Sequence, residues 1–162
     1  MIRIGKVRGK AMEKMKMMLV DDEERFLTTT QKVLSKKGYD AETAMSGQEA
    51  LEKLGVQTIH VVILDVKMPG MDGIATLREI KRRFPLVEVI MLTGHGTVES
   101  AVEGMKSGAT DYLTKPTDVK ELIQKAEEAF EKRKVLEEKI RTAQVRTYQK
   151  SPRQILRESE GR

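Results

Sequence analysis

The sequence predicts an α/β fold in which helices cover both faces of a five-stranded parallel sheet. Short apolar runs alternate five times with longer segments whose apolar residues recur at helical spacing. Strands that alternate with helices of about 10–15 residues are typical of parallel sheets. Four of the apolar runs also end in polar, reactive side chains. Because the carboxyl ends of parallel strands share one edge of a sheet, these side chains are expected at a common ligand-binding edge.

The first two strand–helix units precede residue 56. A buried run at residues 17–20 predicts the first strand, and the helical spacing that follows it ends at Gly38. Residues 40–45 predict a short second strand. The helix of this unit is predicted over residues 46–55, because Ser46-Gly47 can open it and Gly55 can end it.

The other three units follow the same pattern. The clearest strand is predicted at His60–Leu64, and a helix continues from residue 74 to Phe84-Pro85. Val87–Leu92 predicts the fourth strand, and the helix after it ends at Ser107-Gly108. Tyr112–Thr114 predicts a short fifth strand.

Right-handed crossovers restrict how these units connect. They favour a flavodoxin-like sheet with strand order 2-1-3-4-5. The topological switch point of this order lies between the first and third strands. Asp21 and Asp22 follow the first strand, and Asp65 follows the third. The sequence therefore predicts that these three carboxylates meet at one crevice.

Charge is distributed unevenly along the chain. The net charge of +5 arises from the two ends, since residues 1–16 and residues 131–162 each carry an excess of five positive charges, whereas residues 17–130 carry an excess of five negative charges. No aromatic residues interleave with the basic ones as a platform for single-stranded nucleic acid would require, so the ends are interpreted as solvated extensions and no specific nucleic acid binding is expected.

Domain limits follow from these changes in character. Residues 1–14 are predicted to be a basic, disordered extension, residues 15–130 a single domain, and residues 131–162 a basic helical extension with a disordered tail. Within the last helix, apolar residues recur in a heptad pattern that Arg133 interrupts: Leu122, Ala126, Ala129, Leu136, Ile140 and Ala143. Such a seam can pair two helices, so a homodimer is predicted.

The predicted carboxylate cluster suits a divalent cation. Three carboxylates brought close together repel one another, and one takes up a proton unless a cation intervenes. Mg²⁺ prefers oxygen ligands, keeps several waters and often shares a phosphate oxygen. Lys115 and Thr93 also follow strands, and they offer a positive charge and a hydroxyl donor to a phosphate. An aspartate in such a site can act as a nucleophile toward phosphorus.

Four motifs in this order resemble the receiver domain of bacterial two-component response regulators, especially regulators of the nitrogen-regulation type. The acidic pair of the family is resembled by Leu19-Val20-Asp21-Asp22-Glu23. Its phosphoacceptor loop is resembled by Leu64-Asp65-Val66-Lys67-Met68-Pro69-Gly70-Met71-Asp72-Gly73. The switch-threonine segment of the family is resembled by Leu92-Thr93-Gly94-His95-Gly96. Its aromatic-and-lysine segment is resembled by Asp111-Tyr112-Leu113-Thr114-Lys115-Pro116. The resemblance covers roughly residues 16–130, and no output domain is recognisable.

The resemblance implies a role for each matching residue. Asp65 is the implied phosphoacceptor. The implied source of its phosphoryl group is a sensor histidine kinase or a phosphotransfer protein. Asp21, Asp22, Asp65 and the backbone carbonyl of Lys67 are the implied Mg²⁺ ligands. Asp65, Thr93 and Lys115 are implied to carry the phosphoryl chemistry.

The same resemblance implies a switch and its surroundings. Thr93 and Tyr112 are implied to change position on phosphorylation, and the surface of the fourth helix, fifth strand and fifth helix is implied to bind a partner or a second copy. A cis peptide bond is implied at Lys115-Pro116. His95, two residues beyond Thr93, is a candidate for tuning the site.

Simpler interpretations exist for single residues. Asp21 and Asp22 could cap the helix that begins near Glu24, and Thr93 could be an ordinary hydroxyl at the end of a strand. His60 is expected to be structural, since no cysteine and only one other histidine are available to complete a metal site. The constellation as a whole favours the functional interpretation.

Three function classes are a phosphorylation-controlled switch, a phosphatase and a DNA-binding regulator. The last is not favoured, because residues 131–162 show no helix-turn-helix pattern. A phosphorylation-controlled switch is favoured, either as a phosphorelay intermediate or as the receiver of a longer transcriptional regulator. A phosphatase with an aspartate nucleophile, of the haloacid dehalogenase type, would need an acid two residues after the nucleophile, where this chain has Lys67, so a turnover enzyme is not expected. A cytoplasmic location is expected because no apolar run approaches the roughly 20 residues that span a bilayer.

Overall fold

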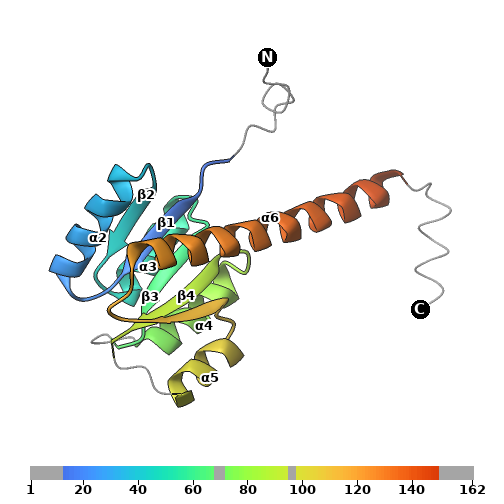
Figure 1. The fold of residues 1–162 in the computed structure, drawn as a ribbon. Coiled ribbons are helices and arrows are strands. Elements are labelled where there is room, and N and C mark those ends of the chain that lie inside the picture. Colours follow the sequence, from blue (N-terminus) through green and yellow to red (C-terminus); the bar gives the residue numbers. More distant parts are fainter. Residues whose placement is uncertain (1–12, 68–71, 95–97, 150–162) are drawn as a thin grey trace.

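The computed structural model describes residues 13–67, 72–94 and 98–149. The five predicted strands and the five predicted helices are all present (Figure 1). In chain order they are β1 (Lys16–Val20), α2 (Glu24–Lys36), β2 (Asp40–Ala44), α3 (Gly47–Val56), β3 (Val61–Asp65), α4 (Gly73–Arg83), β4 (Glu88–Thr93), α5 (Val98–Lys106), β5 (Asp111–Thr114) and α6 (Val119–Gln149). The predicted boundaries differ from these by a few residues, which is the usual uncertainty of element ends.

The sheet is parallel and its order is β2-β1-β3-β4-β5, so the flavodoxin-like prediction is confirmed. Val20 pairs with Leu64 at the carboxyl end of β1 and β3. Asp65, the last residue of β3, pairs with Leu92 on β4. This register places the residues after β1, β3 and β4 at one edge, as the sequence predicts.

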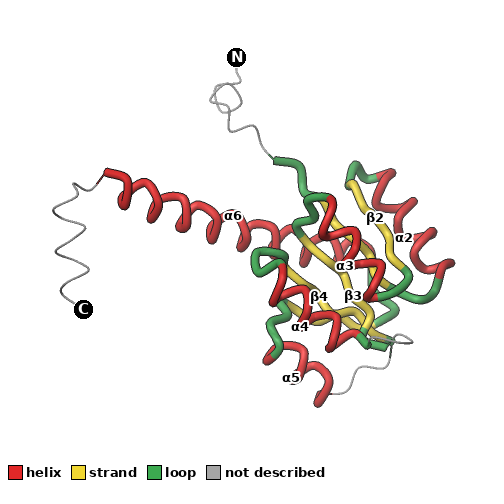
Figure 2. The backbone as a smooth tube through the Cα atoms, turned by 180° about the vertical axis from the view of Figure 1, so that it is seen from behind, coloured by secondary structure: helices red, strands yellow, loops and turns green. Residues whose placement is uncertain are grey.

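Two helical layers enclose the sheet (Figures 1 and 2). Strand residues alternate between the two faces because successive side chains of a strand point in opposite directions. Met17, Leu19 and Ile63 pack with α2 and α6. Met18, Val62 and Leu64 pack with α3 and α4. Each face of β1 and β3 is thus buried, which explains their unbroken apolar sequences.

Helix termini follow local signals in the sequence. Gly38 follows the C-cap residue Lys37 of α2 and adopts a φ of +89°, a conformation that glycine reaches without steric cost. Ser46 caps α3, since its side chain accepts a hydrogen bond from the Glu49 backbone N–H. Asp72 caps α4 in the same way through the Ala75 N–H. The cap at Asp72 matters for the site because α4 begins directly after the loop that leaves β3.

Helix α6 extends well beyond the sheet (Figure 1). The predicted pairing seam from Leu122 to Ala143 is wrong for its first half, because Leu122, Ala126 and Ala129 are buried in the core of the domain itself. Arg133 is also turned toward the domain, where its guanidinium Nη1 donates to the Ile59 carbonyl oxygen over 3.1 Å. Only the part of the seam beyond Arg133 is available to a partner.

His60 has the structural role that the sequence predicts. Its ring is buried, and Nδ1 accepts a hydrogen bond from the Lys16 backbone N–H over 2.9 Å. Nε2 lies 2.8 Å from a Glu13 carboxylate oxygen, and the ring lies 4.9 Å from that of Phe130. His60 therefore joins the start of β1 to α6.

None of the helices in the described parts of the chain has the length and apolar character needed to cross a membrane. The predicted disorder of residues 1–14 and of the C-terminal tail falls mostly on residues 1–12 and 150–162, which lie outside the described residues.

Candidate functional site

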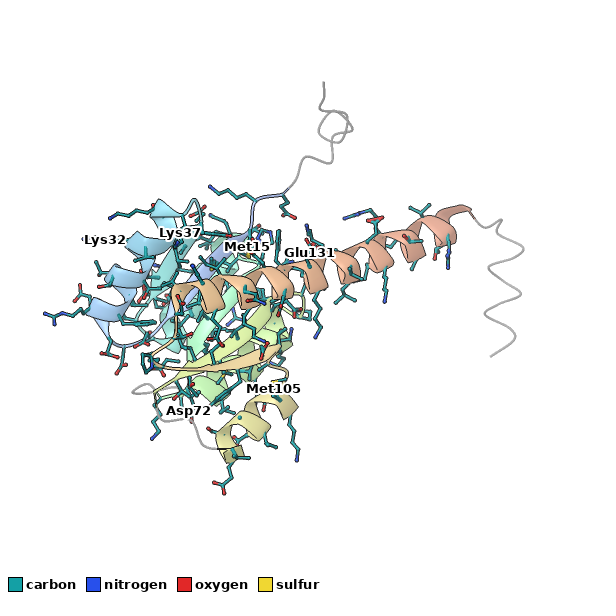
Figure 3. All side chains as sticks on the ribbon, viewed as in Figure 1. Met15, Lys32, Lys37, Asp72, Met105 and Glu131 are labelled. Carbon is teal, nitrogen blue, oxygen red and sulfur yellow. The ribbon has the colours of Figure 1, made fainter. Side chains whose placement is uncertain are left out.

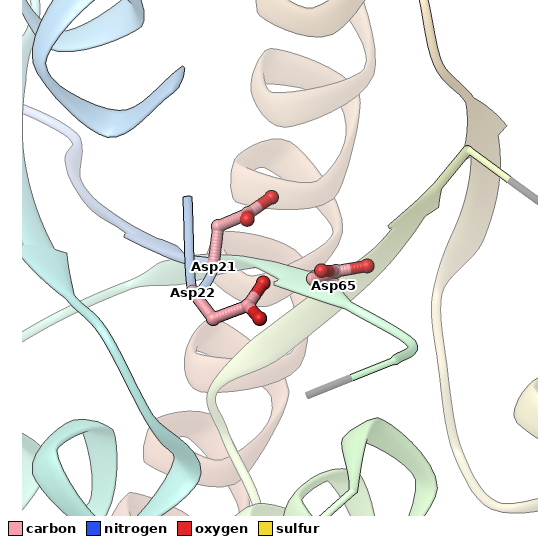
Figure 4. A group of neighbouring side chains, drawn as sticks. All are labelled: Asp21, Asp22 and Asp65. Atoms are coloured by element: carbon pink, nitrogen blue, oxygen red, sulfur yellow. The ribbon is translucent and has the colours of Figure 1, made fainter. Parts of the chain in front are cut away.

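Three carboxylates meet at the carboxyl edge of the sheet (Figure 4). One oxygen from each of Asp21, Asp22 and Asp65 lies within 4.8 Å of the other two. Asp21 is 1% exposed and Asp65 is 7% exposed, whereas Asp22 is exposed to solvent. The cluster is therefore a concentrated negative charge that solvent reaches from the side of Asp22.

The turn after β1 fixes the position of Asp21. Its backbone N–H donates to the Ala44 carbonyl oxygen over 3.1 Å, and its Oδ1 accepts from the Glu23 N–H over 2.8 Å. The alternative that the acidic pair caps α2 is wrong in detail, because the capping position is Glu23 and no side chain caps it. Asp21 stabilises the turn with Oδ1, while its Oδ2 lies 2.5 Å from Lys115 Nζ.

Lys115 is the nearest cation to this cluster. Its Nζ lies 2.5 Å from Asp21 Oδ2 and 3.5 Å from Glu23 Oε1, and it lies 4.3 Å from the centre of the Phe26 ring. Burial works to lower the pKa of Lys115, but the hydrogen bond and charge of Asp21 outweigh it and the pKa is raised. Lys115 thus stays charged, yet one ammonium cannot balance three carboxylates.

The backbone holds Lys115 at this edge. Its N–H donates to the Thr93 carbonyl oxygen over 2.7 Å, which continues the pairing of β4 with β5. The peptide bond between Lys115 and Pro116 is cis, as the resemblance implies.

The carboxyl group of Asp65 has a raised pKa. Burial raises its pKa to about 6, and the charge of Asp21 adds to the effect. Lys115 and the Lys67 backbone N–H, which lies 3.3 Å from Asp65 Oδ1, oppose it. The Asp65 carboxylate is therefore held close to other negative groups at some cost in free energy, and a cation would relieve that cost.

Replacement of this carboxylate should stabilise the fold. The raised folded-state pKa means that the folded chain binds a proton more tightly than the unfolded chain, so stability falls as the pH rises from about 4 through 6. In metal-free buffer at pH 8, Asp65→Asn should therefore unfold at higher urea concentration than the parent, by about 1–2 kcal/mol after solvent screening. The difference should vanish near pH 4, where both proteins carry a neutral side chain.

Asp72→Asn is the matched control for this measurement. Asp72 is exposed, and asparagine caps helices as well as aspartate does. Its stability at pH 8 should lie within about 0.5 kcal/mol of that of the parent, because the cap of α4 is kept. If Asp65→Asn is no more stable than the parent at pH 8, the repulsion inferred for the cluster is absent.

Thr93 and Tyr112 flank the cluster on β4 and β5. Thr93 is buried at the last position of β4. Tyr112 is half-buried and packs against the core shared with α4, and its hydroxyl oxygen is buried without a hydrogen-bond partner among the described residues. Tyr112 therefore already points inward.

Two further predicted residues are Lys67 and His95, and two residues without a predicted role also contact the site. Lys67 is exposed beside Asp65, so its side chain lies in solvent while its backbone faces the cluster. His95 lies outside the described residues. Glu23 and Phe26 contact Lys115, although the sequence analysis assigns them no role; only their place after the acidic pair could have indicated it.

Comparison with known proteins agrees with this geometry. The profile of the response regulator receiver domain matches residues 17–127. The chain belongs to this family. Receiver domains are signalling modules whose general function is phosphorylation on an aspartate, and they generally bind Mg²⁺ through acidic residues.

Relatives include transcriptional regulators. The transcriptional regulatory protein ZraR of Escherichia coli is 43% identical over 113 residues, which are 70% of this chain and 26% of ZraR. The DNA-binding transcriptional regulator NtrC of Klebsiella pneumoniae is 39% identical over 105 residues, 65% of this chain and 22% of NtrC. The chain thus spans about a quarter of the length of these relatives.

Solved structures show the same fold. The receiver domain of NtrX from Brucella abortus superposes with a TM-score of 0.67 at 36% identity, over 71% of this chain and 98% of that one. A receiver domain protein from Clostridium thermocellum gives a TM-score of 0.70 at 38% identity, over 75% and 98% of the two chains.

Proposed function

We propose that this chain is a phosphorylation-controlled switch and that Asp65 is its phosphoacceptor. The observation that carries the proposal is the buried Asp65 carboxylate, which lies among two further carboxylates with Lys115 at the same sheet edge. The donor is a phosphohistidine on a sensor histidine kinase or a phosphotransfer protein. Incubation with acetyl phosphate and Mg²⁺ tests the proposal, because it should add one phosphoryl group per chain, detected by intact mass.

The chemistry is an in-line transfer. An Asp65 carboxylate oxygen attacks phosphorus, the phosphorus–nitrogen bond to the donor imidazole breaks, and the imidazole leaves with the bonding electron pair and takes up a proton. The Lys115 ammonium and the Thr93 hydroxyl would hold the phosphoryl oxygens. The chain acts as a switch and not as a turnover phosphatase, because Lys67 stands two residues after Asp65, where such a phosphatase would need an acid.

Mg²⁺ fits the donor set. The Asp21, Asp22 and Asp65 carboxylates and the Lys67 carbonyl oxygen would hold it, because Mg²⁺ prefers oxygen ligands and the cluster has excess negative charge. The bound ion would neutralise charge on the transferring phosphoryl group. The exposure of Asp22 leaves a path by which solvent and donor reach the cluster.

Removal of the exposed carboxylate should weaken the metal site. Asp22→Ala is expected to lower Mg²⁺ affinity by about tenfold or more, because one of few anionic ligands is lost. Isothermal titration at pH 8 measures it, and Glu24→Ala, which removes an exposed carboxylate of the first turn of α2, is the control. Equal Mg²⁺ affinity in Asp22→Ala and the parent would show that the ion binds elsewhere.

The switch would pass through Thr93 and Tyr112 to the surface of α5, β5 and α6. Helix α5 already exposes Val98, Val102 and Met105, the last of which is labelled in Figure 3. A partner that buries these apolar side chains could distinguish the two states of the surface. This surface includes the fourth and fifth helices of the predicted series, and it does not require nucleic acid contact.

Thr93→Ala should separate phosphorylation from switching. The variant keeps the Asp65 nucleophile, so it should still be labelled by acetyl phosphate, but it lacks the hydroxyl that would follow the phosphoryl group. Hydrogen exchange of α5 and β5, with and without beryllofluoride, is therefore expected to change in the parent and to stay constant in the variant. The same change in both proteins would contradict the role given to Thr93.

We infer that the surface of this receiver acts on an output domain of the kind its relatives carry. We place the receiver at residues 15–130 in the cytoplasm, as part of a longer transcriptional regulator of the kind its relatives represent. The alternative is a phosphorelay intermediate. Rapid return of the phosphoryl group to a histidine phosphotransfer protein would favour that alternative.

A further inference from the structure

Gly73, the first residue of α4, packs directly against the backbone of the phosphoacceptor strand. Its N–H donates to the Val66 carbonyl oxygen over 2.9 Å. A Cβ atom added at Gly73 would lie 2.3 Å from the Asp65 carbonyl oxygen and 2.6 Å from Val66 Cα. These two atoms and the Val66 carbonyl oxygen, which would lie 2.7 Å away, are all backbone, so no flexible side chain can move aside. The glycine is needed for space, since its φ is not in the left-handed region.

The opposite side of the same helical turn is also closed. Thr76 is fully buried, and its hydroxyl donates to the Asp72 carbonyl oxygen over 2.9 Å. That hydroxyl oxygen occupies the place where a Cβ of Gly47 on α3 would lie, at 2.1 Å. Helix α4 is thus held between α3 and the end of β3, and a side chain at Gly73 cannot be accommodated by moving α4 toward α3.

A Cβ atom added at Gly73 must then displace the Asp65–Val66 peptide. The Asp65 carboxylate and the Lys67 backbone both project from this short segment, and they lie 3.3 Å apart at Asp65 Oδ1 and Lys67 N. Mg²⁺ requires ligand oxygens near 2.1 Å in nearly octahedral geometry, so small shifts of a ligand weaken binding. Misplacement of a reacting group by about 1 Å can slow a reaction by about a hundredfold.

We propose that Gly73 is a positioning residue for the Asp65 carboxylate and the Lys67 carbonyl, with Thr76 and Gly47 as the brace behind it. This inference rests on the proposed function for the role of the two groups, but not for the contact itself. Gly73 acts only through the backbone that it contacts, and it touches neither metal nor phosphoryl group.

The test compares three single variants of the full chain. Gly73→Ala should lower Mg²⁺ affinity and the rate of labelling by acetyl phosphate at saturating Mg²⁺, each by about tenfold or more. Gly55→Ala is the matched control, since an added Cβ there meets no atom within 4 Å in the same kind of helix. Ile80→Ala controls for stability, because it opens a cavity under α4 away from the site.

The outcomes are distinct. Loss of Mg²⁺ affinity in Gly73→Ala, with parental affinity in both controls, supports the inference. Parental affinity and labelling in Gly73→Ala overturns it, and so does an equal loss in Ile80→Ala, which would show a general effect of lower stability. Absence of labelling in the parent would instead contradict the proposed function, while the Mg²⁺ titrations would still decide the role of Gly73.

A second pair of variants carries the test if Gly73→Ala does not fold. Gly47→Ala pushes on Thr76 from the other side and should also weaken Mg²⁺ binding. Thr76→Ala in the same chain removes the contacted hydroxyl and should restore most of the affinity. An unchanged affinity in Gly47→Ala, or no recovery in the double variant, would overturn the brace.

Discussion

Asp65→Asn will take up no acid-labile phosphoryl group from acetyl phosphate and Mg²⁺, whereas the parent will take up one. The amide has the shape of the carboxylate but lacks its negative charge, so it cannot act as a nucleophile toward phosphorus. We expect a complete loss of labelling, not a slower rate, because the proposed nucleophile is the buried carboxylate at the end of β3 and the substitution removes it. Intact mass and acid lability of the label measure it.

Two further variants make this result specific. Asp72→Asn changes an exposed aspartate shortly after Asp65 and should be labelled like the parent. Asp22→Asn keeps the nucleophile but removes a proposed metal ligand, so it should be labelled slowly and respond to higher Mg²⁺. Undiminished labelling of Asp65→Asn would move the phosphoacceptor to another residue and overturn the proposed function.

The sheet edge could be predicted because parallel topology leaves few alternatives. Once the runs before Asp21, Asp65 and Thr93 are assigned as parallel strands, their ends must lie at one edge, whatever the details of packing. The cluster of three carboxylates follows from this placement and from the adjacency of β1 and β3. The order of the strands therefore determines which residues meet at the site, independently of their side-chain contacts.

The contacts of Lys115 could not be predicted in the same way. The sequence places its amine at the edge, but the direct ion pair with Asp21 and the contact with the Phe26 ring depend on rotamers and on the turn after β1. The pKa of Asp65 likewise depends on burial and on the distance to Asp21, which a linear pattern does not contain.

The role of Gly73 could not be predicted from the sequence for a different reason. Glycine within a motif can supply a positive φ, a close approach or neither, and the sequence does not distinguish these cases. Only the position of α4 against Asp65 and Val66 shows that the absence of a Cβ matters there.

Periodicity in α6 was ambiguous for a physical reason. A heptad pattern describes an apolar stripe on a helix, and the stripe can be buried by the domain or by a second helix. Leu122 and Ala126 are buried by the domain, while Leu136 and Ile140 are each 41% exposed. The transition lies near Arg133, whose Nη1 donates to the Ile59 carbonyl oxygen of the domain.

We expect the free part of α6 to pair with a second copy of this chain. Residues 138–147 are exposed throughout, and Figure 3 shows their side chains away from the domain beyond Glu131. A lone helix of this length is only marginally stable in water, so pairing would stabilise it. Leu136, Ile140 and Ala143 keep the heptad spacing, and in a parallel pair Lys132 would face Glu137 of the second copy with opposite charge.

We therefore expect the full chain to dimerise, and Leu136→Glu with Ile140→Glu to weaken the dimer by roughly a hundredfold or more, because buried unpaired carboxylates are strongly unfavourable. Val135→Glu with Val145→Glu is the matched control, since these two exposed residues lie off the seam and carry the same change in charge.

Sedimentation with and without beryllofluoride measures the oligomeric state of the parent, of both double variants and of a chain that ends at Phe130. Monomers of the parent under both conditions, or equal weakening by the control pair, would refute pairing through this seam. A dimer that survives the seam substitutions but appears only with beryllofluoride would instead place the contact on α5, β5 and the first half of α6.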